Sequence, residues 1–316
     1  MPDFPLATAL AAGPVVLDGG LATELEARGH DLSSALWSAR LLHDAPEEVV
    51  AAHATFAAAG AQVATTASYQ ASVEGLARAG VDAAGARRLI VRSVELARRG
   101  APEAWIAGSV GPYGAALANG SEYTGGYADQ LGVERLRRWH RPRMQWLADA
   151  GADVLACETV PAAAEAEALL EEADMLGVPV WLSLTTVVDG DGVVRTRRGE
   201  PADEVFAMAY GNDAVVAVGV NCTDPDGVPA AVTAATVSGK PVVVYPNSGE
   251  RWDAAARRWT GTPGLSPDDA LSWIDAGARL VGGCCRVGPA SIAALADLCS
   301  PLRDRRDGGT GPVLSS

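Results

Sequence analysis

Residues 15–23 read Val-Val-Leu-Asp-Gly-Gly-Leu-Ala-Thr, a short apolar run that ends in an aspartate and two glycines. Such a run, followed by a helix-length segment, predicts a buried strand of a parallel sheet that is covered by helices. An open doubly wound sheet usually carries a G-x-G-x-x-G fingerprint directly after its first strand, and residues 18–23 do not supply one. The stretch therefore favours a closed barrel over an open sheet.

The same pattern repeats along the chain. Short apolar runs predict eight strands, at residues 15–17, 62–66, 104–109, 153–157, 178–184, 215–220, 241–245 and 278–282. Alanine-rich or amphipathic segments predict the covering helices, at residues 46–59, 82–99, 133–150, 162–176, 201–210, 228–237, 266–276 and 289–298. Eight βα pairs in a row indicate an α/β protein that forms a single-domain (β/α)8 TIM barrel over residues 1–302. Residues 303–316 are polar and glycine-rich, and they predict a flexible C-terminal tail.

Composition excludes several classes of partner. The 316 residues include 25 Lys and Arg against 39 Asp and Glu, a net charge of −14, so we expect no binding to a nucleic-acid backbone. No apolar run reaches the roughly 18 residues that cross a bilayer, and the N-terminus lacks the positive region of a secretory signal. We therefore expect a cytoplasmic protein without a membrane partner. Its five cysteines, an odd number in a long chain, predict reduced thiols in place of a disulfide framework.

Three of the cysteines lie where a barrel carries its chemistry, at the C-terminal ends of strands. Cys222 follows the sixth predicted strand, and Cys284 and Cys285 follow the eighth. Three thiolates form a soft site for which Zn²⁺ is the expected ion, and the open fourth position is typical of catalysis. Adjacent side chains of a regular strand point to opposite faces, so we expect Gly282-Gly283 to let the backbone turn sharply.

The alternative is that these cysteines pack in the core, where free cysteine is common. Their place at two strand ends, beside glycines, favours the metal site. For Cys157 and Cys299, at the end of a strand and of the last helix, packing is the expectation.

Two other classes of barrel enzyme need residues that this chain does not have at its predicted strand ends. A Schiff-base aldolase needs a lysine after a strand, and the only lysine, Lys240, precedes the seventh predicted strand. A histidine-rich metallohydrolase needs imidazoles at strand ends, whereas the four histidines lie in predicted helices or loops, at positions 30, 43, 53 and 140. Neither class fits this chain.

Seven motifs at the predicted strand ends match one known family. They are Asp18-Gly19-Gly20, Thr65-Thr66-Ala67-Ser68-Tyr69-Gln70, Gly111-Pro112-Tyr113-Gly114, Glu158-Thr159-Val160-Pro161, Gly219-Val220-Asn221-Cys222, Tyr245-Pro246-Asn247-Ser248-Gly249-Glu250 and Gly282-Gly283-Cys284-Cys285-Arg286. Together, in this order, they closely resemble the zinc-dependent homocysteine S-methyltransferases, and the chain is most similar to the branch that uses S-methylmethionine. The resemblance covers residues from about Val15 to Cys299, and its Asn-Cys and Gly-Gly-Cys-Cys-Arg elements are highly specific as a pair.

The resemblance implies a reaction and its ligands. Cys222, Cys284 and Cys285 would hold Zn²⁺, which accepts the sulfur of L-homocysteine as its fourth ligand. A methyl group from S-methylmethionine, or from S-adenosylmethionine, would then pass to the zinc-bound thiolate and form methionine. The four thiolates would keep the sulfur electron-rich and stabilise the transition state of transfer from a cationic sulfonium.

Substrate-binding residues are also implied by the resemblance. Asp18 and Glu158 would bind the ammonium group of homocysteine, and amides near Gly19 and Gly20 its carboxylate; the alternative for Asp18 is a turn residue that bonds its own backbone. Aromatic rings suit a sulfonium cation. The candidates are Trp37, for which helix packing is the alternative, Tyr69 and Tyr113.

Other roles stay open at this point. Asn247 either approaches the metal when substrate is absent or only holds its loop. Arg286 orients either the turn or a carboxylate, and the polar insert at residues 189–200 is either a lid or a hairpin turn. The donor and the oligomeric state are not decided by the sequence. Alternatives to the main hypothesis are betaine as donor, a selenocysteine-derived compound such as selenohomocysteine or another thiol as acceptor, and a zinc- or amino-acid-binding barrel without turnover.

Overall fold

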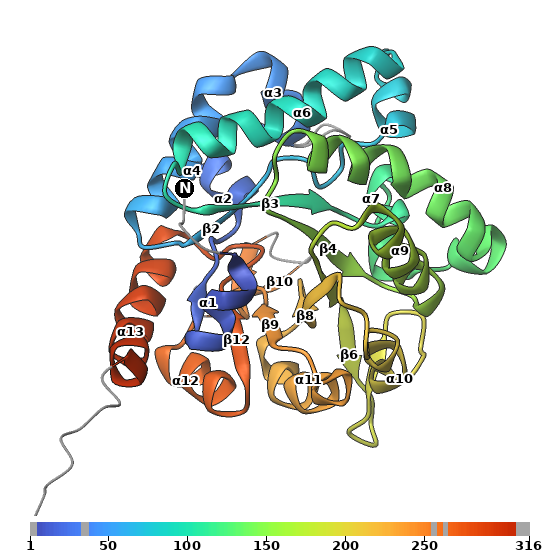
Figure 1. Ribbon diagram of the computed structural model, residues 1–316. Helices are drawn as coiled ribbons and strands as arrows, with labels where there is room; N and C mark the ends of the chain where they lie inside the picture. Colours follow the sequence, from blue (N-terminus) through green and yellow to red (C-terminus); the bar gives the residue numbers. More distant parts are fainter. Residues whose placement is uncertain (1–4, 33–37, 254–257, 262–264, 308–316) are drawn as a thin grey trace, which may run out of the picture.

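The computed structural model describes residues 5–32, 38–253, 258–261 and 265–307, and its main sheet is a closed parallel barrel (Figure 1). The strands of the barrel are β1 (Val15–Val16), β2 (Val63–Thr65), β3 (Trp105–Val110), β4 (Val154–Val160), β5 (Val180–Leu184), β8 (Val215–Asn221), β9 (Val242–Tyr245) and β12 (Ala278–Val281). They pair in the order β1-β12-β9-β8-β5-β4-β3-β2, and a parallel bridge between Leu17 and Val63 closes the ring. The predicted (β/α)8 barrel is confirmed, with all eight strands in their predicted places.

Helices surround the barrel. The outer ring consists of α4 (Pro46–Ala58), α6 (Ala83–Gly100), α8 (Ala128–Asp149), α9 (Ala163–Leu176), α10 (Ala202–Ala207), α11 (Val228–Ala235), α12 (Pro267–Asp275) and α13 (Pro289–Asp307). Shorter helices occupy the connections and the N-terminal segment: α1 (Leu6–Ala12), α2 (Leu21–Ala27), α3 (Ser38–Asp44), α5 (Val73–Arg78), α7 (Tyr113–Leu117), η1 (Ser121–Tyr123), η2 (Pro225–Gly227) and η3 (Thr236–Ser238). Side-chain caps define several starts; the carboxylate of Asp82, for example, accepts a 2.7 Å hydrogen bond from the amide of Gly85 at the first turn of α6.

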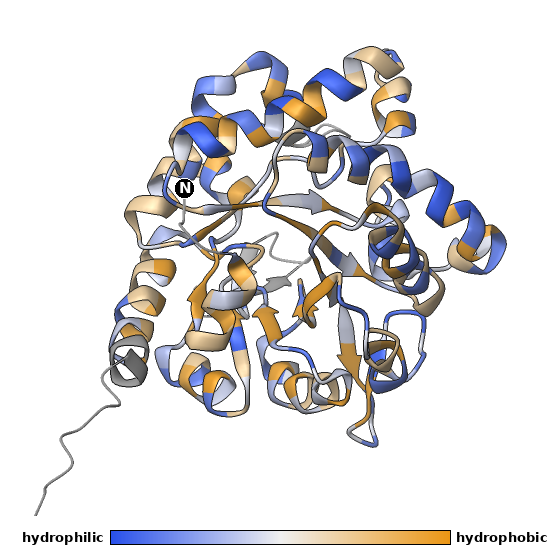
Figure 2. Cartoon of the chain, in the orientation of Figure 1, coloured by the Kyte–Doolittle hydropathy of each residue, from blue (hydrophilic) through white to orange (hydrophobic). Residues whose placement is uncertain are grey.

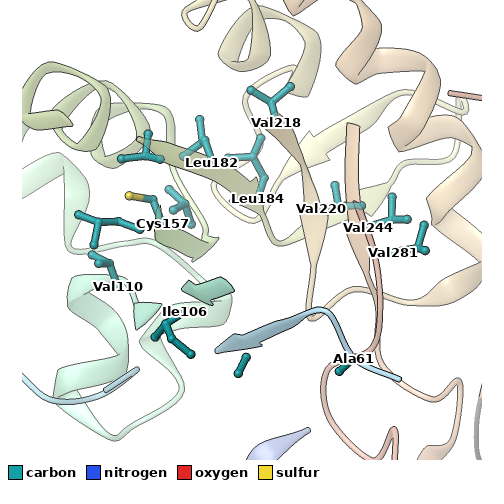
Figure 3. Packing of buried hydrophobic residues seen from close by; sticks show 14 of the residues in the cluster. Ala61, Ile106, Val110, Cys157, Leu182, Leu184, Val218, Val220, Val244 and Val281 are labelled. Carbon is teal, nitrogen blue, oxygen red and sulfur yellow. The ribbon is translucent and has the colours of Figure 1, made fainter. Parts of the chain in front are cut away.

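Alternating side chains of the strands build two apolar layers. On β5, Trp181 belongs to the cluster inside the barrel, whereas Leu182 and Leu184 belong to the cluster between strands and helices, where Figure 3 shows them. The inner cluster also contains Leu6 and Leu10 of α1, so this helix covers the amino-terminal end of the barrel. The carboxyl ends of the strands are therefore left as the end that can receive a ligand.

Two connections carry small antiparallel hairpins. The first pairs β6 (Thr186–Val188) with β7 (Val194–Thr196), and the second pairs β10 (Arg251–Asp253) with β11 (Arg258–Thr260). The insert at residues 189–200 thus contains a hairpin turn, which is one of its two expected forms.

The C-terminal boundary differs from the prediction. The flexible tail was expected from residue 303, but α13 continues to Asp307. Residues 303–307 are Arg and Asp, which do not break a helix, and the first helix-breaking residues are Gly308 and Gly309. Residues 308–316 lie outside the described part of the chain.

Hydropathy follows this architecture, with apolar strands and helices of mixed character around them (Figure 2). Among the described residues, no helix is long and apolar enough to cross a membrane. Cys157 and Cys299 are buried in the core, which confirms the packing role expected for both.

Candidate active site

A cavity of about 130 Å³ lies at the carboxyl ends of the strands. The residues that line it include Asp18, Gly19, Gly20, Thr23, Thr65, Tyr69, Ser109, Tyr123, Glu158, Thr159, Asn221, Cys222, Tyr245, Cys284 and Cys285. Its floor is the inner layer of the barrel, where the indole of Trp181 donates a 2.9 Å hydrogen bond to the Tyr245 hydroxyl. Eight of the eleven predicted site residues meet here; the other three are Trp37, Tyr113 and Asn247.

The three predicted metal ligands come together at one wall of the cavity. The Sγ atom of Cys222 lies 2.7 Å from that of Cys284 and 3.7 Å from that of Cys285, and all three lie within 4.8 Å of one another. All are free cysteines. Around tetrahedral zinc, with Zn–S distances of about 2.3 Å, sulfur atoms lie roughly 3.8 Å apart. The observed spacing therefore fits one metal ion after small side-chain movements, and the soft donor set suits zinc.

The pKa values of the three thiols are shifted in different directions. Hydrogen bonds from Cys222 and Cys284 hold the pKa of Cys285 well below its ordinary value. The contacts with Cys222 and Cys285, together with burial, raise the pKa of Cys284. One thiolate is thus stabilised by two neutral thiols, and a bound cation is what would let all three ionise.

The loop after β12 brings Cys284 and Cys285 to the same site. The amide of Cys284 donates to the carbonyl of Pro246 (2.8 Å), and the amide of Cys285 donates to Oδ1 of Asn247 (3.2 Å). The chain turns at Cys285-Arg286, where Arg286 has a φ of 62°, and neither Gly282 nor Gly283 has a positive φ. Their role is steric, because a Cβ on Gly283 would lie 2.1 Å from a methyl group of Val287.

Two buried carboxyl groups, those of Asp18 and Glu158, line the same cavity as the thiols. Asp18 accepts hydrogen bonds from the amide (2.7 Å) and hydroxyl (2.9 Å) of Thr65, and Glu158 accepts one from the Ser109 hydroxyl. Burial raises the pKa of each carboxyl to about 7, although these hydrogen bonds oppose the shift. A cationic group placed between them would favour their ionised forms, so the pair is suited to an ammonium ligand.

A residue in the left-handed backbone conformation lies near the carboxyl end of both β4 and β8. Thr159 has φ of 59° and Cys222 has φ of 48°, which is uncommon for residues other than glycine. The side chain of Asn221 spans the two strands: its Oδ1 accepts from the amide of Thr159 (2.6 Å), and its Nδ2 donates to the Thr159 hydroxyl (2.7 Å). These bonds hold the residue that follows Glu158 and the residue that precedes Cys222, so Asn221 sets the relative position of these two candidate site residues.

Two tyrosines lie on the cavity wall. Tyr69 was predicted, and its backbone carbonyl is held by the guanidinium of Arg143 at 3.2 Å. Tyr123 of η1 was not predicted; its hydroxyl lies 3.8 Å from the Sγ of Cys222, within hydrogen-bonding range of sulfur. Nothing in the local sequence marked Tyr123, because a single turn of 3-10 helix has no apolar periodicity.

Tyr113 lies away from the cavity. Its ring packs against Tyr127 and Trp139, with centroids 5.2 Å and 5.0 Å apart, in the helix layer. Trp37, the remaining aromatic candidate, lies outside the described residues.

Four further predicted positions lie in the loops that surround the cysteines. A Cβ on Gly19 or Gly20 would lie 2.3 Å from the carbonyl of Val287 or 2.6 Å from that of Cys284, so both glycines are sterically required. The amide of Gly20 already donates to Val287, which leaves other amides for a ligand carboxylate. Asn247 holds the loop through the amide of Cys285. Arg286 donates to both oxygens of Glu250, at 2.6 Å and 3.1 Å, and so orients the turn.

Comparisons with known proteins agree with this geometry. A family model described as "Homocysteine S-methyltransferase" matches residues 15–299. The homocysteine S-methyltransferase of Escherichia coli K12 is 46% identical over 301 residues, with 89% of this chain and 94% of that protein covered. A selenocysteine Se-methyltransferase of Brassica oleracea is 40% identical over 308 residues, covering 90% and 88% of the two chains. Among solved structures, the metallated form of the homocysteine methyltransferase MmuM from Escherichia coli superposes with a TM-score of 0.79 at 43% identity, covering 90% of this chain and 96% of that one.

Proposed function

Because this chain belongs to the homocysteine S-methyltransferase family, we propose that it transfers a methyl group from S-methylmethionine to the sulfur of L-homocysteine, forming methionine. The observation that carries the proposal is the meeting of three free thiols with two buried carboxyl groups across one small cavity. The thiols suit a soft metal, the carboxyl groups suit an ammonium, and homocysteine carries a thiol and an ammonium at its two ends.

We propose that Cys222, Cys284 and Cys285 hold Zn²⁺. When bound, zinc would accept the homocysteine sulfur and lower the pKa of that thiol, so that the sulfur reacts as a thiolate at neutral pH. The spacing of the three Sγ atoms and their softness support this assignment. Reduced thiols also agree with a cytoplasmic location, which we propose together with small molecules as the partners.

The rest of the chemistry belongs to the side chains of the chain. Asp18 and Glu158 would bind the ammonium of homocysteine and thereby direct its sulfur toward the cysteines. The sulfur lone pair then forms a bond to the donor methyl group, the donor C–S bond breaks, and its electron pair stays on the donor sulfur. The sulfonium loses its positive charge in this step. We propose that the rings of Tyr69 and Tyr123 lie beside that cation.

A donor panel tests this function. The purified protein, with its metal content measured, is incubated with homocysteine and S-methylmethionine, S-adenosylmethionine or betaine, and methionine formation is followed. We expect bound zinc and the fastest turnover with S-methylmethionine. Zinc without turnover on any donor would contradict the enzyme assignment, and turnover by protein free of metal would contradict the zinc assignment.

A second acceptor has a specific observation in its favour. One relative at 40% identity is a selenocysteine Se-methyltransferase. Selenocysteine is one methylene shorter than homocysteine, so its selenium would not reach the cysteines as easily from the same ammonium site. We expect kcat/KM to favour homocysteine when the two acceptors are compared with the same donor; the reverse order would make selenocysteine the better assignment.

A further inference from the structure

A second cavity borders the chain directly after Cys222. Its volume is about 570 Å³, and the residues that line it include Thr186, Arg197, Thr223, Asp224, Asp226 and Glu250. Thr223 follows Cys222 directly, and Asn247, which holds the amide of Cys285, is also in the wall. Both cavities therefore border the loops that carry the cysteines.

Arg197 is tied to this boundary at two points. Its Nε donates to the hydroxyl of Thr185 (3.2 Å), which in turn donates to the carbonyl of Cys222 (3.2 Å). Its guanidinium carbon lies 5.8 Å from the centre of the Tyr123 ring, and the Tyr123 hydroxyl contacts the Sγ of Cys222. The stem and one nitrogen of Arg197 are thus held in place, and within the described residues no hydrogen bond is found for its two terminal nitrogens. A fixed guanidinium with two such nitrogens is suited to a carboxylate.

The proposed reaction needs homocysteine and an amino-acid donor to bind at the same time, with their two sulfur atoms close together. The first cavity has one pair of groups for an ammonium, Asp18 and Glu158, and homocysteine would use them. A donor such as S-methylmethionine carries its own ammonium and carboxylate, which need a separate place within reach of the same cysteines. The second cavity combines a guanidinium with acidic side chains, whereas the described lining of the first cavity includes no arginine.

We propose that the second cavity binds the α-amino-acid end of the sulfonium donor, with the donor carboxylate on Arg197 and its ammonium facing Asp224 and Asp226. The proposal rests on the proposed function, since it assigns the donor side of the same reaction. The Asp224–Asp226 segment contains a turn in which Asp224 accepts from the amide of Asp226 (3.1 Å), so the acidic wall is preformed. A donor without an amino-acid end would gain nothing from Arg197.

Equilibrium binding gives the first test, because it needs no turnover. S-methylmethionine is titrated into the full-length protein by calorimetry, without homocysteine. Replacing Arg197→Met keeps the alkyl stem and removes the charge, and we expect Kd to rise about 10- to 100-fold. Arg197→Lys keeps a cation and should give an intermediate Kd. Arg198→Met is the matched control, since Arg198 is exposed and paired with Asp129, and its Kd should equal that of the wild type.

A second donor separates recognition from a general effect on the site. With homocysteine as acceptor, Arg197→Met should raise KM for S-methylmethionine by a similar factor and leave the slow reaction of trimethylsulfonium, which has no carboxylate, within about threefold of the wild type. Equal losses with both donors, unchanged binding of S-methylmethionine by Arg197→Met, or no binding by the wild type would overturn the proposal. If the wild type binds the donor through Arg197 but forms no methionine, the proposed function fails and the binding site stands.

Discussion

Glu158 and Glu165 are two buried glutamates in neighbouring elements, and their surroundings differ in kind. Glu158, on β4, faces the cavity and accepts a hydrogen bond from the Ser109 hydroxyl; this bond and one from the Tyr245 hydroxyl lower its pKa, but burial outweighs them and raises the pKa to about 7. Glu165, on α9, is fully buried and accepts hydrogen bonds from the amide of Tyr113 (2.7 Å), from Nε2 of His140 (2.9 Å) and from the Tyr127 hydroxyl. The first carboxylate has positions left for a ligand, whereas protein donors occupy the second.

Glu165 belongs to a buried network that also includes His140 and Arg143, here called the α8–α9 network. The guanidinium of Arg143 donates to Nδ1 of His140 (2.9 Å) and to the carbonyls of Gly111 (2.5 Å) and Tyr69 (3.2 Å). Burial lowers the pKa of His140, which agrees with a neutral ring that accepts from Arg143 and donates to Glu165. The network joins the helices to the loops after β2 and β3. A buried carboxylate whose acceptor positions are filled by protein donors, like Glu165, therefore supports the fold, whereas Glu158 keeps positions for the proposed ammonium ligand.

The largest expected effect is on the metal site. Cys284→Ser replaces a soft ligand by a hard one, so we expect loss of bound metal and a fall in kcat/KM of roughly 1,000-fold or more. The free energy of unfolding should change little, because the side chain lies at the mouth of the barrel and not between its layers. Metal analysis, initial rates and thermal unfolding check the three expectations.

Cys157→Ser is the matched control for that prediction. Cys157 lies in the core between strands and helices, so its replacement should lower stability and leave metal content and turnover unchanged. Full activity in Cys284→Ser, or metal loss in Cys157→Ser, would contradict the division between the two kinds of cysteine.

The second-largest expected effect is a loss of stability on changing the α8–α9 network. Glu165→Gln removes the charge that accepts hydrogen bonds from His140, Tyr113 and Tyr127, and the loss of such buried, charge-assisted hydrogen bonds should lower the free energy of unfolding by about 2–3 kcal/mol. The KM for homocysteine should stay near its wild-type value, since Glu165 does not line the cavity. Denaturant unfolding and steady-state kinetics measure the two quantities. A large rise in KM with unchanged stability would reverse the assignment of the two regions.

The difference between the cavity and the α8–α9 network also explains which features could be predicted from the sequence. Strand alternation and the rule that barrels react at strand ends were enough to predict the eight strands and the rim on which Cys222, Cys284 and Glu158 lie. Those are properties of repeating local pattern, and the family resemblance then assigned roles to the residues. Helix α13 extends past the predicted start of the tail, because the Arg and Asp residues at 303–307 do not interrupt a helix.

Side-chain direction within loops could not be predicted in the same way. Tyr69 and Tyr113 both follow strands, yet one lines the cavity and the other packs on Trp139, because tertiary contacts of α8 decide which way each loop faces. For the same reason Tyr123 was not predicted as a site residue, and Asn221 was named only within the Asn-Cys motif, without a role of its own. Their importance comes from partners about 60 to 100 residues away, Thr159 and Cys222, which no local pattern encodes.

Glu158→Gln should lower activity and raise stability together. Loss of the ionic contact with ammonium should reduce kcat/KM for homocysteine about 10- to 100-fold. The raised pKa means that folding favours the protonated carboxyl, so stability is lost as pH rises from about 4.5 toward 7. The glutamine has no such cost, and at pH 8 it should stabilise the ligand-free protein by roughly 3 kcal/mol.

Thermal unfolding at pH 5 and pH 8 checks this sign. The difference between Glu158→Gln and the wild type should be small at pH 5, where the native carboxyl is protonated, and large at pH 8. A variant that is less stable than the wild type at pH 8 would show that Glu158 acts like Glu165, as part of the structure.

The smallest effects come from removing a single hydroxyl from each region. Tyr123→Phe removes a weak hydrogen bond to the Sγ of Cys222 and should change kcat about threefold without affecting stability. Tyr127→Phe removes a hydrogen bond to Glu165 and should lower the free energy of unfolding by about 1 kcal/mol without affecting kcat. The two replacements delete the same atom, so any difference between them comes from the partner. If both variants lost stability alone, the Tyr123 hydroxyl would belong with the structural contacts, and the boundary of the reactive region would lie at the cysteines.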